Sequence, residues 1–273
     1  VTDGREFKVL FLGDSFMEGL EEAYTIPASV RRYYRLLRQD GPELITLNAG
    51  CASYSPAIFI PQAKRLIPLL RPDFVVVVID ETDLGDDFIC YKDLIVRDAQ
   101  GKISAVKRSP PLYMFLSGLS MIKKQPLYLT RLIMKIYHTR VYMPNFISNY
   151  HRKGPRLTLD FSSDKNASPE KYAKEIAFFE GNLAELTETL VGLMGDKTRI
   201  FFICHPHLQH LKPDAFGFYW NHFVSDSVKK VCHNYGVAFY NATEDLKRQF
   251  KGDPADYYLP KDMHFNQRGI EIY

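Results

Sequence analysis

The sequence is poor in the features that mark special classes of protein. Among its 273 residues tryptophan occurs once and cysteine four times, and no run of eighteen residues is uninterruptedly apolar. The short apolar runs give no sign of a membrane span, and a net charge of only +3 gives no reason to expect nucleic acid binding. What is present, 46% hydrophobic and 25% charged residues, is typical of a globular chain with a sizeable core.

The cysteines have no spacing typical of a metal site. They are Cys51, Cys90, Cys204 and Cys232. We expect buried free thiols, with a disulfide as the alternative.

Apolar segments alternate with helical patterns along most of the chain. Strands are predicted at Phe7–Leu12, Leu44–Leu47, Asp73–Ile79, Thr198–Cys204 and Gly236–Tyr240. Helices are predicted at Ala28–Gln39, Pro56–Leu70, 168–194 (with Ser168 as N-cap and Pro169 at N1), Phe216–Tyr235, Glu244–Phe250 and from Gln267. The β-branched run before Asp80 is typical of a strand buried on both faces. The alternation predicts an α/β protein, a three-layer α/β/α sandwich with a flavodoxin-like parallel sheet of five strands.

The middle of the chain breaks this alternation, and we interpret 90–168 as an insertion within a single domain, 1–273. Tyr91–Val106 has the pattern of a hairpin, 110–142 that of one or two helices, and 144–168 is irregular and polar. The mixture of apolar and basic residues in 112–141 suits a membrane surface or a partner, or an ordinary lid subdomain.

In the first predicted helix, Val30, Tyr33, Tyr34 and Leu37 are spaced to form one apolar face.

Gly13-Asp14-Ser15 follows the first predicted strand. In a parallel sheet this loop lies where ligands bind, so Ser15 is a candidate nucleophile with its own N–H nearby. The alternative is an ordinary turn, since Gly, Asp and Ser are all common turn residues.

A base for such a serine is present near the other end of the chain, where His264 follows Asp262 in an extended loop. A histidine can take the serine proton while a carboxylate fixes its tautomer.

Two further strand ends carry candidate oxyanion donors. Gly50, in Asn48-Ala49-Gly50, allows close approach of the backbone to a ligand, although a plain turn explains it equally. Thr82 offers a hydroxyl, and Asp83 is either a helix cap or a group facing the pocket. A fourth loop has His205, His207 and His210. These imidazoles suggest a zinc site, a pocket lining with His205 against substrate, or an ordinary loop.

Taken together, these motifs resemble those of the SGNH (GDSL-type) esterase/lipase superfamily, over 7–88 and 168–273. The resemblance implies that Ser15 is the nucleophile, His264 and Asp262 complete the triad, and the N–H groups of Ser15 and Gly50 hold the oxyanion. It implies no metal or organic cofactor. The sequences of the motifs are similar to those of extracytoplasmic bacterial members of the superfamily that are related to polysaccharide O-acetylation proteins. With a start at Val1 rather than methionine, this leads us to expect a location outside the cytoplasm, near a membrane through a preceding segment.

Two departures from the family pattern concern the third and fourth motifs. Asp80 stands in place of glycine and Thr82 in place of asparagine, and loss of one oxyanion donor costs about 10²–10³ in rate. Asp262 lies two residues before the histidine, with Lys261 at the third position. If a weakened oxyanion hole is the only defect, Thr82→Asn is expected to raise activity sharply.

Three functions follow as hypotheses from this resemblance. The first is a serine ester hydrolase, with an acetyl ester of a carbohydrate as the expected substrate and Asp83 and His205 as substrate-binding residues. The second is an O-acetyltransferase that uses the same triad with a sugar hydroxyl as acceptor. The third is a carbohydrate-binding protein that keeps the fold without turnover.

Overall fold

The computed structural model describes residues 6–19, 24–38, 40–107, 128–137, 168–212, 222–260 and 264–273. Its centre is a parallel sheet of five strands in the order β2-β1-β3-β6-β7. The strands are β1 (Glu6–Leu12), β2 (Glu43–Asn48), β3 (Phe74–Asp80), β6 (Ile200–His205) and β7 (Ala238–Asn241). All five predicted strands are therefore present, and the predicted fold class is confirmed.

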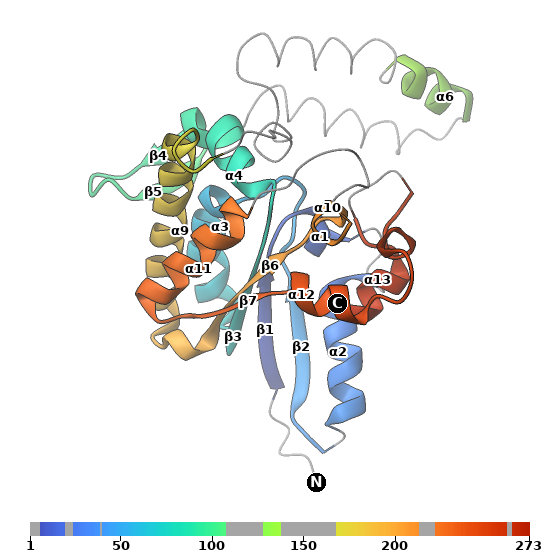
Figure 1. Cartoon of the computed structure of the whole chain (residues 1–273). Coiled ribbons are helices and arrows are strands. Elements are labelled where there is room, and N and C mark those ends of the chain that lie inside the picture. The colour runs from blue at the N-terminus through green and yellow to red at the C-terminus, as the bar shows by residue number, and fades with distance from the viewer. Residues whose placement is uncertain are drawn as a thin grey trace.

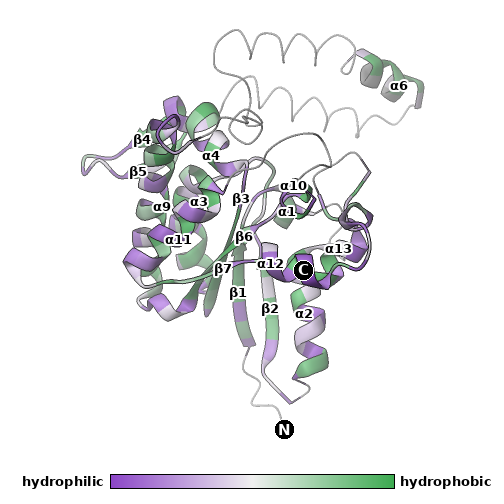
Figure 2. Ribbon diagram, in the orientation of Figure 1, coloured by the Kyte–Doolittle hydropathy of each residue, from purple (hydrophilic) through white to green (hydrophobic). Residues whose placement is uncertain are grey.

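Helices cover both faces of the sheet (Figure 1). On one side lie α3 (Pro56–Leu70), α9 (Ala173–Met194) and α11 (Phe223–Tyr235). On the other lie α1 (Ser15–Glu18), α2 (Ile26–Leu37), α10 (Leu208–Leu211), α12 (Thr243–Gln249) and α13 (Gln267–Ile272). Figure 2 shows hydrophilic and hydrophobic stretches alternating along α9 and α11, as expected of helices with one face on the sheet.

Successive residues of the central strands enter different cores. Leu10 and Val77 belong to the core under α3, α9 and α11, whereas Phe11 and Val78 belong to the core on the α2 side. Side chains alternate across a strand, so a strand buried on both faces has to be apolar at every position. This explains the unbroken valine run of β3.

Two helix predictions need correction. The helix predicted from Ser168 begins at Ala173, because Ser168 Oγ accepts a hydrogen bond from Lys171 N–H (3.2 Å) and caps a turn that precedes the helix. The predicted apolar face of the first helix is wrong at three of its four positions: Val30, Tyr33 and Leu37 are exposed, and only Tyr34 packs against the core. Helix α2 lies against the edge strand β2, of which only Leu44 is buried, so little of the helix is covered. Of the helix predicted at Phe216–Tyr235, residues 216–221 lie outside the described part.

The segment interpreted as an insertion is described only in part. The hairpin is present as β4 (Ile95–Arg97) and β5 (Ile103–Val106), and it follows the irregular helical segments Asp86–Tyr91 and Lys92–Leu94. A helix, α6 (Tyr128–Tyr137), lies within the predicted helical stretch. Residues 108–127 and 138–167, including the irregular stretch, lie outside the described residues. Among the helices that are described, none has the length and apolar character needed to cross a bilayer.

Candidate active site

Ser15 stands at the first turn after β1, where the sequence forces a tight junction. Asp14 caps α1, with Oδ1 accepting a hydrogen bond from Phe16 N–H (2.9 Å). A β-carbon on Gly13 would lie 2.2 Å from Met17 Cγ, so only glycine fits there. The Ser15 N–H donates to no group among the described residues and is available at the start of α1. The junction thus fixes the serine at the carboxyl end of the sheet.

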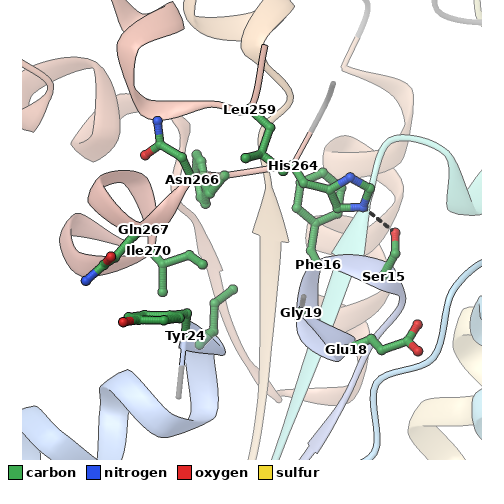
Figure 3. Close-up of a pocket in the computed structure, with 12 residues that line it drawn as sticks. Ser15, Phe16, Glu18, Gly19, Tyr24, Leu259, His264, Asn266, Gln267 and Ile270 are labelled. Atoms are coloured by element: carbon green, nitrogen blue, oxygen red, sulfur yellow. Dashed lines mark hydrogen bonds between the residues drawn. The ribbon is translucent and has the colours of Figure 1, made fainter. Parts of the chain in front are cut away.

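His264 reaches Ser15 from the opposite end of the sequence. Its Nε2 atom lies 2.7 Å from Ser15 Oγ (Figure 3). The loop that carries it is held by a hydrogen bond from Leu259 N–H to the His264 carbonyl (2.9 Å). Its imidazole ring lies 4.7 Å from the Phe16 ring, centroid to centroid. The structure therefore brings together the two side chains that the sequence analysis paired, while their roles as nucleophile and base stay predictions.

Asn266 fixes the chain just after His264. Its Oδ1 accepts from Gly269 N–H (3.1 Å) and caps α13, while its Nδ2 donates to the carbonyls of Asp256 (2.8 Å) and Tyr258 (3.1 Å). These bonds tie the backbone just after His264 to the 256–258 turn and to the start of α13. Asp262, the predicted acid, lies outside the described residues together with Lys261 and Met263. Its role stays a prediction.

Gly50 and Thr82, the two remote oxyanion candidates, have other partners. The Gly50 N–H donates to Asn48 Oδ1 (2.9 Å), and Asn48 Nδ2 donates to the Met17 carbonyl (2.7 Å). The Thr82 hydroxyl donates to Asp80 Oδ1 (2.7 Å). Neither residue lines the pocket around Ser15. In this structure Asn48 and Gly50 brace α1, and Ser15 supplies the backbone N–H that is open to a ligand.

The pocket beside Ser15 has a volume of about 440 Å³ and lies between α1, the start of α2 and the C-terminal loop (Figure 3). Much of its lining is apolar. The lining residues that sequence reasoning did not single out are Phe16, Glu18, Gly19, Tyr24, Ile26, Leu259, Phe265, Asn266, Gln267 and Ile270. No local signal distinguishes such side chains from core residues, because an apolar pocket wall and a core use the same residue types.

Asp83 and His205 do not line this pocket, which corrects their prediction as substrate-binding residues. His205 is buried behind Phe16, with ring centroids 4.0 Å apart, and the rings of Phe265, Tyr273 and, farther away, His207 are its other ring neighbours. Burial lowers the pKa of His205, which keeps the imidazole neutral. Asp83 is fully buried, and its Oδ2 accepts from Asp80 N–H (3.2 Å).

The remaining histidines of that loop pair with carboxylates. His207 Nε2 lies 3.2 Å from Asp80 Oδ2, and His210 Nε2 lies 3.4 Å from Glu81 Oε1, with all four side chains buried. These pairs point the two imidazoles at different carboxylates, while His205 lies among aromatic rings. Accordingly, no group of three His, Cys, Asp or Glu side chains in the described ranges is arranged to hold a metal ion. The four cysteines are all described and all free, as expected, but only Cys204 and Cys232 are buried, whereas Cys51 and Cys90 are partly exposed.

Comparison with known proteins shows the fold. No family model matches the sequence, and no curated protein matches it. Among solved structures, a lipase/acylhydrolase from Enterococcus faecalis is similar over 97% of this chain and 90% of its own, with 12% identity and a TM-score of 0.51. A mutant of an acetyl-xylooligosaccharide esterase from Geobacillus is similar over 100% and 92%, with 14% identity and a TM-score of 0.49. The chain thus has the α/β/α fold of the Enterococcus enzyme, the fold that its motifs predicted.

Proposed function

We propose that the protein is a serine-dependent ester hydrolase. The observation that carries this proposal is the 2.7 Å contact between His264 Nε2 and Ser15 Oγ at the edge of a mostly apolar pocket. A hydroxyl within hydrogen-bond reach of an imidazole is the signature of an activated nucleophile. The pocket volume of about 440 Å³ is in the ~300–1,000 Å³ range of small-molecule sites.

The reaction proceeds in two halves. Ser15 Oγ attacks the ester carbonyl carbon while His264 takes the hydroxyl proton, and the Ser15 N–H stabilises the oxyanion. The C–O bond to the alcohol breaks, and the alcohol leaves with the proton from His264. Water then attacks the acyl-serine and gives a proton to His264, and the carboxylic acid is released as Ser15 recovers its hydrogen. Asp262 orients the histidine in this scheme, as the family resemblance implies.

The pocket suggests how an ester would be oriented. Ile26, Phe265 and Ile270 form an apolar wall that suits the acyl group, while the alcohol extends toward solvent. On the family resemblance, we take an acetylated carbohydrate as the first substrate to test. A transferase would use the same acyl-serine and a sugar hydroxyl in place of water.

The decisive experiment combines turnover with covalent labelling. Hydrolysis of p-nitrophenyl acetate and labelling by a fluorophosphonate probe are measured for the natural chain and for Ser15→Ala. We expect both signals in the natural chain and neither in the variant, with equal thermal melts as the control for folding. A folded natural chain that neither hydrolyses nor labels would overturn the proposal in favour of a binding protein. Transfer of the acetyl group to an added oligosaccharide rather than to water would identify a transferase.

A further inference from the structure

Helix α6 exposes an apolar face to solvent. Leu129, Ile133 and Tyr137 follow one another at intervals of four residues, and Tyr128 and Leu132 form a second row beside them. Each of these five residues, which we call the α6 stripe, is between 41% and 80% exposed. At 3.6 residues per turn the two rows cover about half of the helix circumference. Exposed apolar side chains that gather on one helix face, rather than being scattered singly, mark a surface that binds something.

The position of α6 separates this face from the core. Figure 1 shows α6 apart from the helices that cover the sheet, beyond the carboxyl ends of the strands. In the described part of the chain, none of the three clusters of buried apolar side chains includes a residue of α6. The α6 stripe is therefore not the inner face of a helix of the α/β/α sandwich. It lies at the end of the molecule that also holds Ser15, which follows the carboxyl end of β1.

The sequence that contains α6 is strongly basic. Residues 99–159 include eleven Lys and Arg residues and no Asp or Glu. Because the whole chain has a net charge of +3, subtracting this +11 leaves −8 for the remaining residues. Within α6, Arg131 and Lys135 occupy a third row, next to that of Tyr128 and Leu132. An apolar helix face flanked by basic residues is the pattern of a helix that lies in the plane of a membrane interface.

An anionic bilayer fits this surface better than a macromolecule does. A second copy of the chain would bring two basic segments together, and like charges repel. The helix has 10 residues, whereas a stable protein interface takes about 20–30 residues from each side. A nucleic acid would use the basic residues and leave the apolar ones uncovered. A bilayer uses both at once, and the tyrosines at the two ends of α6, Tyr128 and Tyr137, are of the type enriched at the membrane–water interface.

Helix α2 is the internal comparison, because it also exposes apolar residues. Leu36 is 64% exposed and Leu37 is 81% exposed. The basic residues of α2, however, have carboxylates near them: Arg35 Nη2 lies 3.2 Å from Glu43 Oε1. Helix α2 thus has exposed leucines but no long basic segment free of acidic residues, which makes it a matched control for α6.

We propose that the α6 stripe binds the surface of a bilayer that contains anionic lipids. The apolar side chains of the stripe enter the interface, and the Lys and Arg residues of 99–159 interact with the phosphate groups of the lipids. Such binding turns the end of the sheet that holds Ser15 toward the membrane. The inference goes beyond the proposed ester hydrolysis and does not depend on it, because binding to vesicles requires no turnover.

Co-sedimentation with lipid vesicles tests the proposal. The full chain is mixed with vesicles of phosphatidylcholine alone and with vesicles of equal parts phosphatidylcholine and phosphatidylglycerol. We expect binding to the anionic vesicles to be ~10-fold tighter or more, and to weaken as salt is added, because each Lys or Arg near the surface contributes to the attraction. Equal binding to both kinds of vesicle, or no binding by a folded natural chain, would overturn the proposal.

Paired substitutions assign the binding to α6. Leu132→Gln combined with Ile133→Gln removes apolar surface and keeps good helix propensity, so the affinity for anionic vesicles should fall by ~10-fold or more. Leu36→Gln combined with Leu37→Gln, the matched pair on α2, should bind like the natural chain. Equal affinities of the two double variants would overturn the proposal. So would a natural chain that is a dimer without vesicles and becomes a monomer in the α6 variant, because a second copy would then cover the stripe.

A fluorescence measurement locates α6 in the bound state. With Trp220→Phe as background, Tyr128→Trp on α6 is compared with Leu37→Trp on α2. On anionic vesicles the emission of Tyr128→Trp should shift to shorter wavelength and be quenched by brominated lipids, whereas the emission of Leu37→Trp should stay unchanged. No shift in Tyr128→Trp, or the same shift in both variants, would overturn the proposal. A natural chain that binds vesicles through α6 but hydrolyses no ester would overturn the proposed function and leave the membrane surface assigned.

Discussion

His264 Nε2 and Ser15 Oγ are 2.7 Å apart although 249 positions separate the two residues in the chain. We therefore expect His264→Ala to lower kcat/KM by roughly 10²–10⁴-fold, because the serine then has no imidazole to take its proton. The measurement is p-nitrophenyl ester hydrolysis, paired with the rate of fluorophosphonate labelling. His233→Ala, on an exposed position of α11, is the matched control and should retain full activity. Equal loss in both variants would contradict the assignment.

Gly50 is predicted to be intolerant of a side chain. A β-carbon there would lie 2.5 Å from both Glu18 N and Met17 Cβ, so Gly50→Ala has to push α1 and with it Ser15. Overpacking of this kind costs ~1–3 kcal/mol of unfolding free energy. The control is Gly181→Ala, on the exposed side of α9 where nothing lies within 4 Å, which should stabilise the protein by ~0.5–1 kcal/mol. Urea unfolding of both variants measures the contrast, and equal effects would contradict it.

Asp87 gives a pH dependence of stability with a defined sign. Burial raises the pKa of Asp87 to about 6, although hydrogen bonds from Ser55, Asn182 and Ala57 lower it in part. The pKa of Asp87 is higher in the folded than in the unfolded protein. The protonated carboxyl therefore contributes its full stabilisation below pH 4, and this contribution is lost as the pH rises through 6. The full shift corresponds to at most about 3 kcal/mol.

The measurement is urea unfolding of the natural chain and of Asp87→Asn between pH 4 and 7.5. We expect the advantage of the natural chain over Asp87→Asn to shrink as the pH rises across this range. Asp98→Asn, in the exposed turn of the β4–β5 hairpin, serves as control for a general effect of removing a carboxylate. An advantage that grows with pH would show that Asp87 is ionised throughout.

Ile270 is predicted to limit the length of the acyl group. It belongs to the apolar wall of the pocket, so Ile270→Trp should fill space next to Ser15. We expect the ratio of kcat/KM for p-nitrophenyl hexanoate to that for the acetate to fall by ~10-fold or more, since a few methylene contacts are worth ~1–3 kcal/mol. Ile272→Trp is the comparison on the same helix, outside the lining. An unchanged ratio would show that the acyl group binds in another part of the site.

The sequence predicts the sheet well because the signals there are local. The valine run of β3 predicts a buried strand, and the motifs at the strand ends predict where Ser15 and His264 lie. The helix start at Ile26 was missed, although Thr25 caps it through a hydrogen bond from Ala28 N–H and Pro27 follows.

The errors concern side chains whose partners are remote. Asp83 and His205 look like pocket residues in the sequence because they follow strand ends, but their burial depends on how β3, β6 and the C-terminal loop pack together. Likewise, nothing local reveals that His207 would pair with Asp80, 127 positions earlier. Contacts of this kind follow from the assembled fold and not from the pattern of any one segment.

The position of His264 outside the central sheet has a consequence for the way in which heating inactivates the protein. His264 lies on a C-terminal segment whose described residues add no strand to the five-stranded sheet. The segment packs mainly in a cluster with Leu246, Phe250 and Tyr257, and only its last residues, Ile270 and Tyr273, also contact the core on the α2 side. A cluster of this size can open locally while the sheet stays intact. Heating should therefore abolish turnover below the temperature at which the sheet melts, and hydrogen exchange should be faster in α13 than in β3.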